Sequence, residues 1–195
     1  MDNVLEIKNL KKIYHTKDGE TLAVENFTFD LKEGEFVAIV GPSGCGKSTI
    51  LSVLCGLEEK SDGDITLKEN TKIGYMLQQD SLFEWRNILN NCLLGLEINK
   101  NLNKENRKRV INLLNTYGLK DFINSYPDNL SGGMRQRVAL IRTLANNPTL
   151  LLMDEPFSAL DYQSRLAISD DIYNILKKEK KTMIMVTHDI AESIY

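Results

Sequence analysis

Residues 36–54, FVAIVGPSGCGKSTILSVL, contain the pattern that decides the fold. The five apolar residues at 36–40 are too few for a buried helix and are typical of a strand covered on both faces. Residues 41–48 fit the spacing G-x-x-x-x-G-K-[ST], whose glycines let backbone N–H groups turn towards phosphate oxygens. The stretch therefore predicts a buried strand, a phosphate-binding loop and a helix that ends near Gly56.

Nine residues of this loop are expected to contact a nucleotide: Gly41, Pro42, Ser43, Gly44, Cys45, Gly46, Lys47, Ser48 and Thr49. In this pattern the Lys47 ammonium reaches the β- and γ-phosphates, and the Ser48 hydroxyl binds Mg²⁺. We interpret Cys45 as a small side chain that the loop tolerates. A glycine-rich turn without a ligand is the alternative, but the strand before it and the helix after it favour the phosphate loop.

Two further apolar runs, 150–153 and 183–186, predict strands of the same buried sheet. Asp154 and Glu155 follow the first run directly, and ligands in open α/β sheets bind outside the carboxyl ends of the strands. We therefore expect Asp154 to help hold Mg²⁺ and Glu155 to polarise the water that attacks the γ-phosphate. Because acidic residues often end a strand, this assignment depends on the phosphate loop.

Other segments predict an antiparallel edge sheet and a set of helices. Residues 4–10 and 23–31 alternate between apolar and polar side chains around turn signals. Between about 87 and 147, apolar residues recur at helical spacing, and the last of these helices is predicted to follow Ser131 and to run to Asn147. A further helix is expected after Asp161.

Together these segments predict an α/β fold in a single domain over residues 1–195. We expect a phosphate-loop NTPase core at 1–78 and 148–195, with the antiparallel sheet at its edge. An inserted, mostly helical lobe is expected at about 79–147.

Composition fits this fold and excludes several classes of protein. With 195 residues, of which 42% are hydrophobic and 26% charged, the chain is neither disordered nor collagen-like. Its formal net charge of −3 gives no global basic field for nucleic acid. No apolar run approaches the roughly 18 residues of a membrane helix, and no signal-peptide layout is present. Three cysteines without a Cys-x-x-Cys pair favour a reducing cytosol and no disulfide.

Residues 130–137, LSGGMRQR, add a second anion-binding feature. A serine at a helix N-cap followed by two glycines exposes backbone N–H groups next to a hydroxyl. A capped helix with a flexible entry would explain Ser131, but not Gly132, Gly133 and the basic residues after them. Two phosphate-binding helix ends in one chain are unusual for a simple kinase.

LSGGMRQR resembles the signature motif of ATP-binding cassette (ABC) ATPases, and the motifs of this chain follow that family's order over nearly its whole length. The resemblance implies that the nucleotide is ATP. It also implies that Tyr14 stacks on adenine and that Gln78, rather than its neighbour Gln79, acts in catalysis and binds Mg²⁺. Asp161 resembles the aspartate of the family's D-loop. His188 resembles the switch histidine that contacts the γ-phosphate.

In the resembling family, two cassettes dimerise head to tail. The resemblance therefore implies a homodimer or a cassette pair, with ATP and Mg²⁺ as cofactors. Each ATP would lie between the phosphate loop of one copy and Ser131, Gly132 and Gly133 of another, with Asp161 at the dimer seam. ATP would join the two chains, and hydrolysis would remove the group that joins them, which is a ligand-driven population shift.

The resemblance also implies partners in a membrane. Cassettes of the family bind permease subunits, so we expect this chain at the cytoplasmic face of the cell membrane, with docking near Phe83, Trp85 and Arg86. Residues 78–86 are similar to the L-P-W-R region of cassettes that import nitrate, sulfonates, taurine and related solutes, although Glu84 replaces the proline. A solute-binding protein is an expected partner, and nucleic acid is not.

The chain ends at Tyr195, seven residues after His188, whereas such cassettes normally continue with more core strands and helices. We expect a fragment or a C-terminally short protein with an open sheet edge. A soluble ABC-type ATPase acting on nucleic acid or ribosomes is the alternative function. A nucleotide-binding module that no longer hydrolyses ATP is a third, against which Glu155 and His188 argue.

Overall fold

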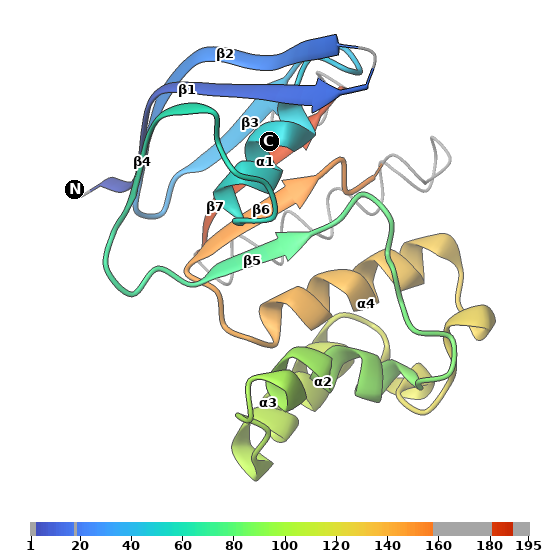
Figure 1. Cartoon of the computed structure of the whole chain (residues 1–195). Helices are drawn as coiled ribbons and strands as arrows, with labels where there is room; N and C mark the ends of the chain where they lie inside the picture. Colours follow the sequence, from blue (N-terminus) through green and yellow to red (C-terminus); the bar gives the residue numbers. More distant parts are fainter. Residues whose placement is uncertain (1–2, 18, 158–180, 189–195) are drawn as a thin grey trace. The chain divides into compact units, whose positions relative to one another are not determined.

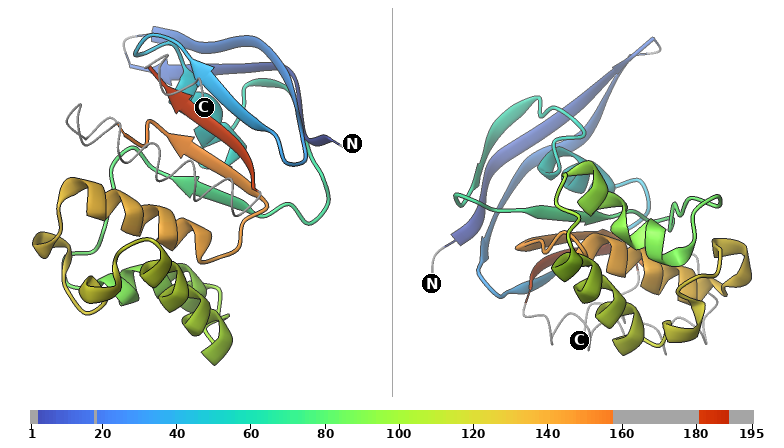
Figure 2. Two further views of the ribbon diagram at one scale, coloured as in Figure 1. Left: turned by 180° about the vertical axis from the view of Figure 1, so that it is seen from behind. Right: turned by 90° about the horizontal axis from the view of Figure 1, so that it is seen from below.

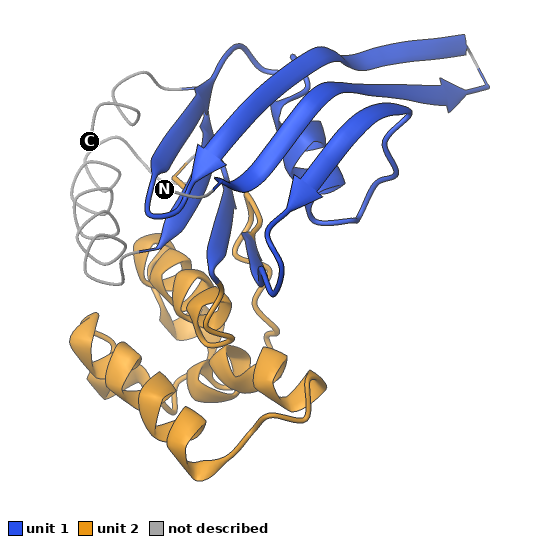
Figure 3. Cartoon of the chain, turned by 90° about the vertical axis from the view of Figure 1, so that its left-hand side faces the viewer, with its two compact units in different colours: residues 1–75, 149–155, 180–195 blue, residues 76–148, 156–179 orange. Residues whose placement is uncertain are grey.

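The computed structural model describes residues 3–17, 19–157 and 181–188. The chain forms two compact units, which Figure 3 shows in different colours. Unit 1 comprises residues 1–75, 149–155 and 180–195, and unit 2 comprises residues 76–148 and 156–179. Within the described ranges, no helix is both long enough and apolar enough to cross a bilayer.

Unit 1 contains an antiparallel sheet in the order β2-β1-β4. Its strands are β1 (Asn3–Thr16), β2 (Gly19–Lys32) and β4 (Asp62–Leu67). Ile7 and Leu10 of β1 are both fully buried although they are three residues apart, which a regular strand would not allow. A shift in register between them, with Asn9 at φ +52°, forms a bulge that returns Leu10 to the core.

The second sheet of unit 1 has the order β3-β7-β6-β5, seen side by side in Figure 2 (left). These strands are β3 (Phe36–Val40), β7 (Thr182–Thr187), β6 (Leu150–Asp154) and β5 (Ile73–Met76). All residues of β6 and β7 are buried, which is why their sequences are nearly continuous apolar runs. Both β3 and β6 run parallel to β7, with Val40 opposite Thr187 and Asp154 opposite Val186. The carboxyl ends of the three strands therefore lie at one edge of the sheet.

Helix α1 (Lys47–Leu54) lies between the two sheets of unit 1 (Figure 1). Its apolar side chains join a single hydrophobic core with residues of β1, β2, β6 and β7. Leu51 is fully buried there, as are Leu5 of β1 and Leu152 of β6. This packing fixes the N-terminus of α1 beside the strand ends.

Unit 2 is helical in its described part. It contains α2 (Ile88–Ile98), α3 (Lys104–Thr116) and α4 (Gly132–Leu144), with short 3-10 turns at Lys120–Phe122 and Pro127–Asn129. Each long helix has a side-chain N-cap, supplied by Asn87, Asn103 and Ser131 respectively. Helix α2 packs against both α3 and α4.

The predicted fold class is confirmed, with differences in the bounds of the elements. Strands β1 and β2 are each 14 residues long, more than the alternating pattern indicated, because bulges interrupt that pattern. Helix α4 ends at Leu144, before the expected Asn147, whose φ of +50° is left-handed and cannot continue a helix. The helix predicted after Asp161 lies outside the described residues.

Candidate nucleotide-binding site

The phosphate loop joins β3 to α1, and its path depends on a glycine. Gly46 has φ +92°, and a Cβ at this position would lie 2.1 Å from the carbonyl oxygen of Ala23 in β2. Gly46 is also the N-cap of α1, and it has no side chain that could accept a hydrogen bond from the N–H groups of the first turn. A helix N-terminus of this kind attracts anions through its N–H groups and partial positive charge.

Replacing Gly46 with alanine is expected to lower the free energy of unfolding by more than about 2 kcal/mol, since the left-handed backbone and the approach to Ala23 both penalise a Cβ. Gly44 is the matched control. It has φ +82°, but a Cβ there meets nothing within 4 Å among the described residues, so Gly44→Ala should lose only about 1 kcal/mol. Urea unfolding measures both losses. Equal losses would mean that the loop moves away from Ala23 without penalty.

Lys47 is the first residue of α1 and is 5% exposed. Its ammonium donates hydrogen bonds to the carbonyl oxygens of Gly41 at 2.7 Å and Pro42 at 2.9 Å. A buried ammonium needs such partners because it has lost its water. The positive charge is therefore held against the first two residues of the loop.

Asp154, the last residue of β6, receives hydrogen bonds from two hydroxyl groups. Ser48 Oγ donates to Asp154 Oδ1 at 2.8 Å, and Tyr75 Oη of β5 donates to Asp154 Oδ2 at 3.2 Å. The side chain of Asp154 lies almost wholly inside the protein, with the residue 6% exposed. The sequence predicts that Ser48 and Asp154 both bind Mg²⁺, and their hydrogen bond is consistent with that prediction. The part played by Tyr75 was missed, because it depends on β5 lying next to β6.

Ser48 and Asp154 together suit Mg²⁺, which prefers oxygen ligands. In nucleotide sites Mg²⁺ usually keeps several waters and binds one or two carboxylates plus phosphate oxygens. One carboxylate beside one hydroxyl, next to the phosphate loop, fits that pattern. In the described part of the chain, no group of three or more His, Cys, Asp or Glu residues could hold a metal ion by itself.

Replacing Tyr75 with phenylalanine is expected to weaken divalent-cation binding roughly 10-fold. Burial, and then the charge of Asp154, raise the pKa of the Tyr75 phenol. The protonated hydroxyl donates to Asp154 Oδ2 and so orients the carboxylate. Titration of the nucleotide-loaded chain with Mn²⁺, followed by electron paramagnetic resonance, measures the loss. Tyr126→Phe, at a 50% exposed tyrosine of unit 2, is the control. Unchanged Mn²⁺ affinity in Tyr75→Phe would show that Asp154 needs no such support.

Glu155 and His188 lie close together after β6 and β7. His188 Nδ1 is 3.2 Å from Glu155 Oε2, and the side chain of Glu155 is 15% exposed. Glu155 has φ +43°, which is uncommon for a residue with a Cβ, and its N–H donates to the carbonyl oxygen of Val186 at 2.9 Å. The structure thus places these two predicted catalytic side chains within hydrogen-bonding distance of each other.

Tyr14, the expected adenine platform, lies in β1 opposite Thr21. The ammonium of Lys12 lies 4.6 Å from the centroid of the Tyr14 ring, a cation–π contact. Lys12 also donates to Glu58 Oε2 at 2.9 Å. The ring is therefore supported by a fixed cation.

The remaining predicted site residues belong to unit 2 or lie outside the residues that the structure describes. Ser131 is exposed, and its Oγ accepts a hydrogen bond from the Met134 N–H at 3.4 Å. Gly132 and Gly133 are the first two residues of α4. Gln78 is exposed in the turn after β5. Asp161 is outside the described residues.

Known proteins resemble this chain over most of its length. The sequence model of the ABC transporter family matches residues 24–158. The uncharacterised ABC transporter ATP-binding protein YtlC of Bacillus subtilis (strain 168) is 46% identical over 196 residues, which cover 97% of this chain and 75% of that protein. The aliphatic sulfonates import ATP-binding protein SsuB of Bacillus cereus (strain ZK / E33L) is 38% identical over 197 residues, which cover 98% of this chain and 77% of SsuB.

A solved structure shares the fold. It is a dimeric ATP-binding cassette in a post-hydrolysis state, bound to ADP and Pi. The two chains are 34% identical and superpose with a TM-score of 0.81, over 97% of this chain and 90% of the other.

Proposed function

This chain belongs to the ABC transporter family and is an ATPase of that family, and we propose that it energises a membrane importer of small nitrate-, sulfonate- or taurine-like solutes. The main observation in support of an ATPase site is the arrangement of side chains at the carboxyl ends of the parallel strands. There Lys47 is hydrogen-bonded to the phosphate loop, Ser48 is hydrogen-bonded to Asp154, and Glu155 lies beside His188.

We propose that the first three of these residues bind the nucleotide. The Lys47 ammonium would donate to the β- and γ-phosphates, and the N–H groups at the start of α1 would bind phosphate oxygens. Ser48 and Asp154 would hold Mg²⁺, with Gln78 as a further ligand. Tyr14 would stack on adenine. When bound, Mg²⁺ supplies positive charge that stabilises the oxygens of the transferring phosphoryl group.

Glu155 is proposed as the general base. Its carboxylate accepts a proton from water while the water oxygen bonds to the γ-phosphorus. The bond from that phosphorus to the β–γ bridging oxygen breaks, and ADP leaves with the electron pair. His188 Nδ1 lies 3.2 Å from Glu155 Oε2. This contact would orient the carboxylate, and Nε2 would be the ring atom that meets the γ-phosphate. Gln78 would help to place the attacking water.

A second cassette is proposed to complete each site. Ser131 and the N–H groups of Gly132 and Gly133 form the beginning of α4 and would bind the γ-phosphate of a nucleotide held by another copy. Asp161 would line the seam between the copies. The dimeric state of the solved cassette supports this arrangement.

Permease subunits are proposed to bind residues 83–86, named here the docking segment. Trp85 is 75% exposed, and its ring centroid lies 4.7 Å from that of Phe83. Arg86 Nη2 donates to both carboxylate oxygens of Glu97, at 2.8 and 2.7 Å, which fixes the end of the segment. An exposed tryptophan on a fixed support is typical of an interface. With such partners the cassette would lie at the cytoplasmic face of the cell membrane, and a solute-binding protein would deliver the solute from the other side.

We propose nitrate, sulfonate or taurine-like small solutes as the transported class. The similarity to SsuB, whose name specifies aliphatic sulfonates, supports this class. The likeness of residues 78–86 to the corresponding region of such cassettes supports it as well.

Co-purification and uptake test the proposal. The tagged full-length chain is expected to purify from membranes together with a polytopic subunit. Vesicles containing that assembly are expected to take up labelled taurine or an alkanesulfonate when ATP is supplied. Purification with ribosomes or nucleic acid would instead favour a soluble ATPase, and an assembly without ATP turnover would favour a module that only binds nucleotide.

A further inference from the structure

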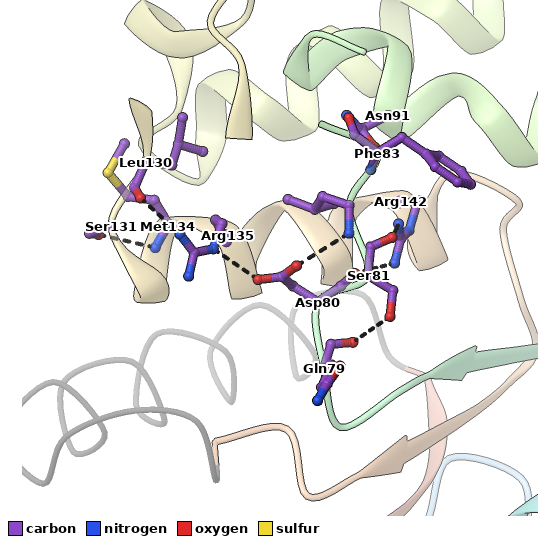
Figure 4. A network of polar contacts seen from close by, with 11 residues as sticks. Gln79, Asp80, Ser81, Phe83, Asn91, Leu130, Ser131, Met134, Arg135 and Arg142 are labelled. Carbon is purple, nitrogen blue, oxygen red and sulfur yellow. Dashed lines mark hydrogen bonds and ion pairs between the residues drawn. The ribbon is translucent and has the colours of Figure 1, made fainter. Parts of the chain in front are cut away.

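Two arginines of α4 bind the segment that follows Gln78, all within unit 2 (Figure 4). Arg135 Nε donates to Asp80 Oδ2 at 2.9 Å. Arg142 donates from Nη1 to the carbonyl oxygen of Ser81 at 2.7 Å and from Nη2 to that of Asp80 at 2.5 Å. The arginines are seven residues apart, about two helical turns, so they lie on one face of α4. We call Asp80, Arg135 and Arg142 the arginine clamp.

The clamp has a specific chemical requirement. Burial lowers the pKa of the Arg142 guanidinium, which indicates a charge partly withdrawn from water, and such a charge needs its donors paired. The planar guanidinium offers donors on two separate nitrogens in a fixed geometry, whereas a lysine ammonium offers its donors on one nitrogen. On the other side, Asp80 Oδ1 accepts from the Leu82 N–H at 3.2 Å, which turns the carboxylate towards Arg135.

The clamp reaches the beginning of α4. Arg135 Nη1 donates to the carbonyl oxygen of Leu130 at 3.4 Å, and Leu130 directly precedes Ser131. Arg135 therefore contacts both the segment after Gln78 and the residue before Ser131. While these bonds persist, the two segments cannot shift independently.

The docking segment continues directly from the clamp. The Phe83 N–H donates to Asn91 Oδ1 at 2.8 Å, and Asn91 Nδ2 donates to the carbonyl oxygens of Phe83 at 3.0 Å and Arg86 at 2.8 Å. Asn91, in α2, is fully buried. The docking segment is thus held at both of its ends, and it begins directly after Leu82.

We propose that Asp80, Arg135 and Arg142 are positioning residues that make the segment after Gln78, the docking segment and the beginning of α4 move as one body. The inference rests on the proposed function, because it assigns the link between a permease subunit and the ATP site of the opposite cassette. Displacement of the docking segment is passed to Ser131, while the phosphate loop, which holds ATP in the same copy, is not part of the clamp. The clamp therefore governs turnover rather than ATP affinity.

Arg142→Met tests the inference in the full-length chain, because methionine keeps apolar length but removes every N–H donor. We expect kcat for ATP to fall roughly 10-fold, and KM and the Kd of a fluorescent ATP analogue to stay within about twofold of their original values. Arg142→Lys, which keeps the charge but is shorter and lacks the planar pair of Nη donors, should lie between. Amides of residues 79–83 should exchange hydrogen faster in Arg142→Met.

Arg109→Met is the matched control. Arg109 of α3 is also half-buried and also donates to two backbone carbonyl oxygens, those of Leu144 and Ala145 at the other end of α4. Equal kcat losses in the two variants, an unchanged kcat in Arg142→Met, or a loss expressed through KM would each overturn the inference. An unaltered chain that turns over no ATP would count against the proposed function instead. In that case unchanged hydrogen exchange at 79–83 in Arg142→Met would overturn the clamp.

Discussion

Replacing Lys47 with alanine is expected to lower the affinity for ATP by roughly 100-fold or more while the fold stays intact. Hydrogen bonds from an ammonium to a phosphate are charge-assisted and contribute about 1.5–3 kcal/mol each, and alanine has no donor to replace them. The present acceptors of Lys47, the carbonyl oxygens of Gly41 and Pro42, lie in a loop that reaches the surface and can bond water instead. The free energy of unfolding should therefore change by no more than about 1 kcal/mol.

Titration with a fluorescent nucleotide and urea unfolding separate these two effects. Lys8→Ala is the control, since the Lys8 side chain is 66% exposed on β1. It should change neither quantity. Unchanged nucleotide affinity in Lys47→Ala would contradict the proposed phosphate site. Loss of the folded state would instead show that Lys47 has a structural role.

Replacing Glu155 with glutamine is expected to lower ATP turnover by roughly 100- to 1,000-fold while ATP still binds. Glutamine has nearly the same shape, can keep the N–H bond to Val186, and can still contact His188. Its amide cannot take a proton from water, so the γ-phosphate stays in place. An ATP-dependent dimer should then accumulate, because the group that joins two cassettes is no longer removed.

Phosphate release and gel filtration with ATP and Mg²⁺ measure these outcomes. Glu25→Gln, at an exposed glutamate of β2, provides the matched control for the same change of charge. If Glu155→Gln and the unaltered chain turned over ATP at equal rates, Glu155 would not be the base.

The parts of the site that could be predicted from the sequence are those that depend on near neighbours or on strand ends. The strand, the loop and the helix are contiguous in residues 36–54, so the phosphate loop can be predicted without knowledge of contacts to distant residues. Asp154 and His188 each follow a buried apolar run, and parallel strands end at a common edge. These two facts were enough to predict the α/β class and the proximity of Ser48 to Asp154.

The other contacts depend on which elements become neighbours. Tyr75 reaches Asp154 because β5 is placed beside β6, and periodicity says nothing about strand order. Arg142 bonds backbone carbonyl oxygens, which carry no side-chain signature in the sequence. The roles of the site residues, those of Gln78, Ser131 and Asp161 included, and the limits of the lobe stay predictions.

The left-handed backbone at Glu155 sets the stability of the fold against the proposed catalytic role of the same residue. A side chain with a Cβ costs about 1 kcal/mol in that conformation, and glycine, which adopts it without strain, has no carboxylate. With Glu155 as the proposed base, a laboratory selection for heat resistance alone is expected to favour loss of the carboxylate and to yield more stable cassettes that do not hydrolyse ATP. Engineering of this protein has to select for its reaction and its robustness together.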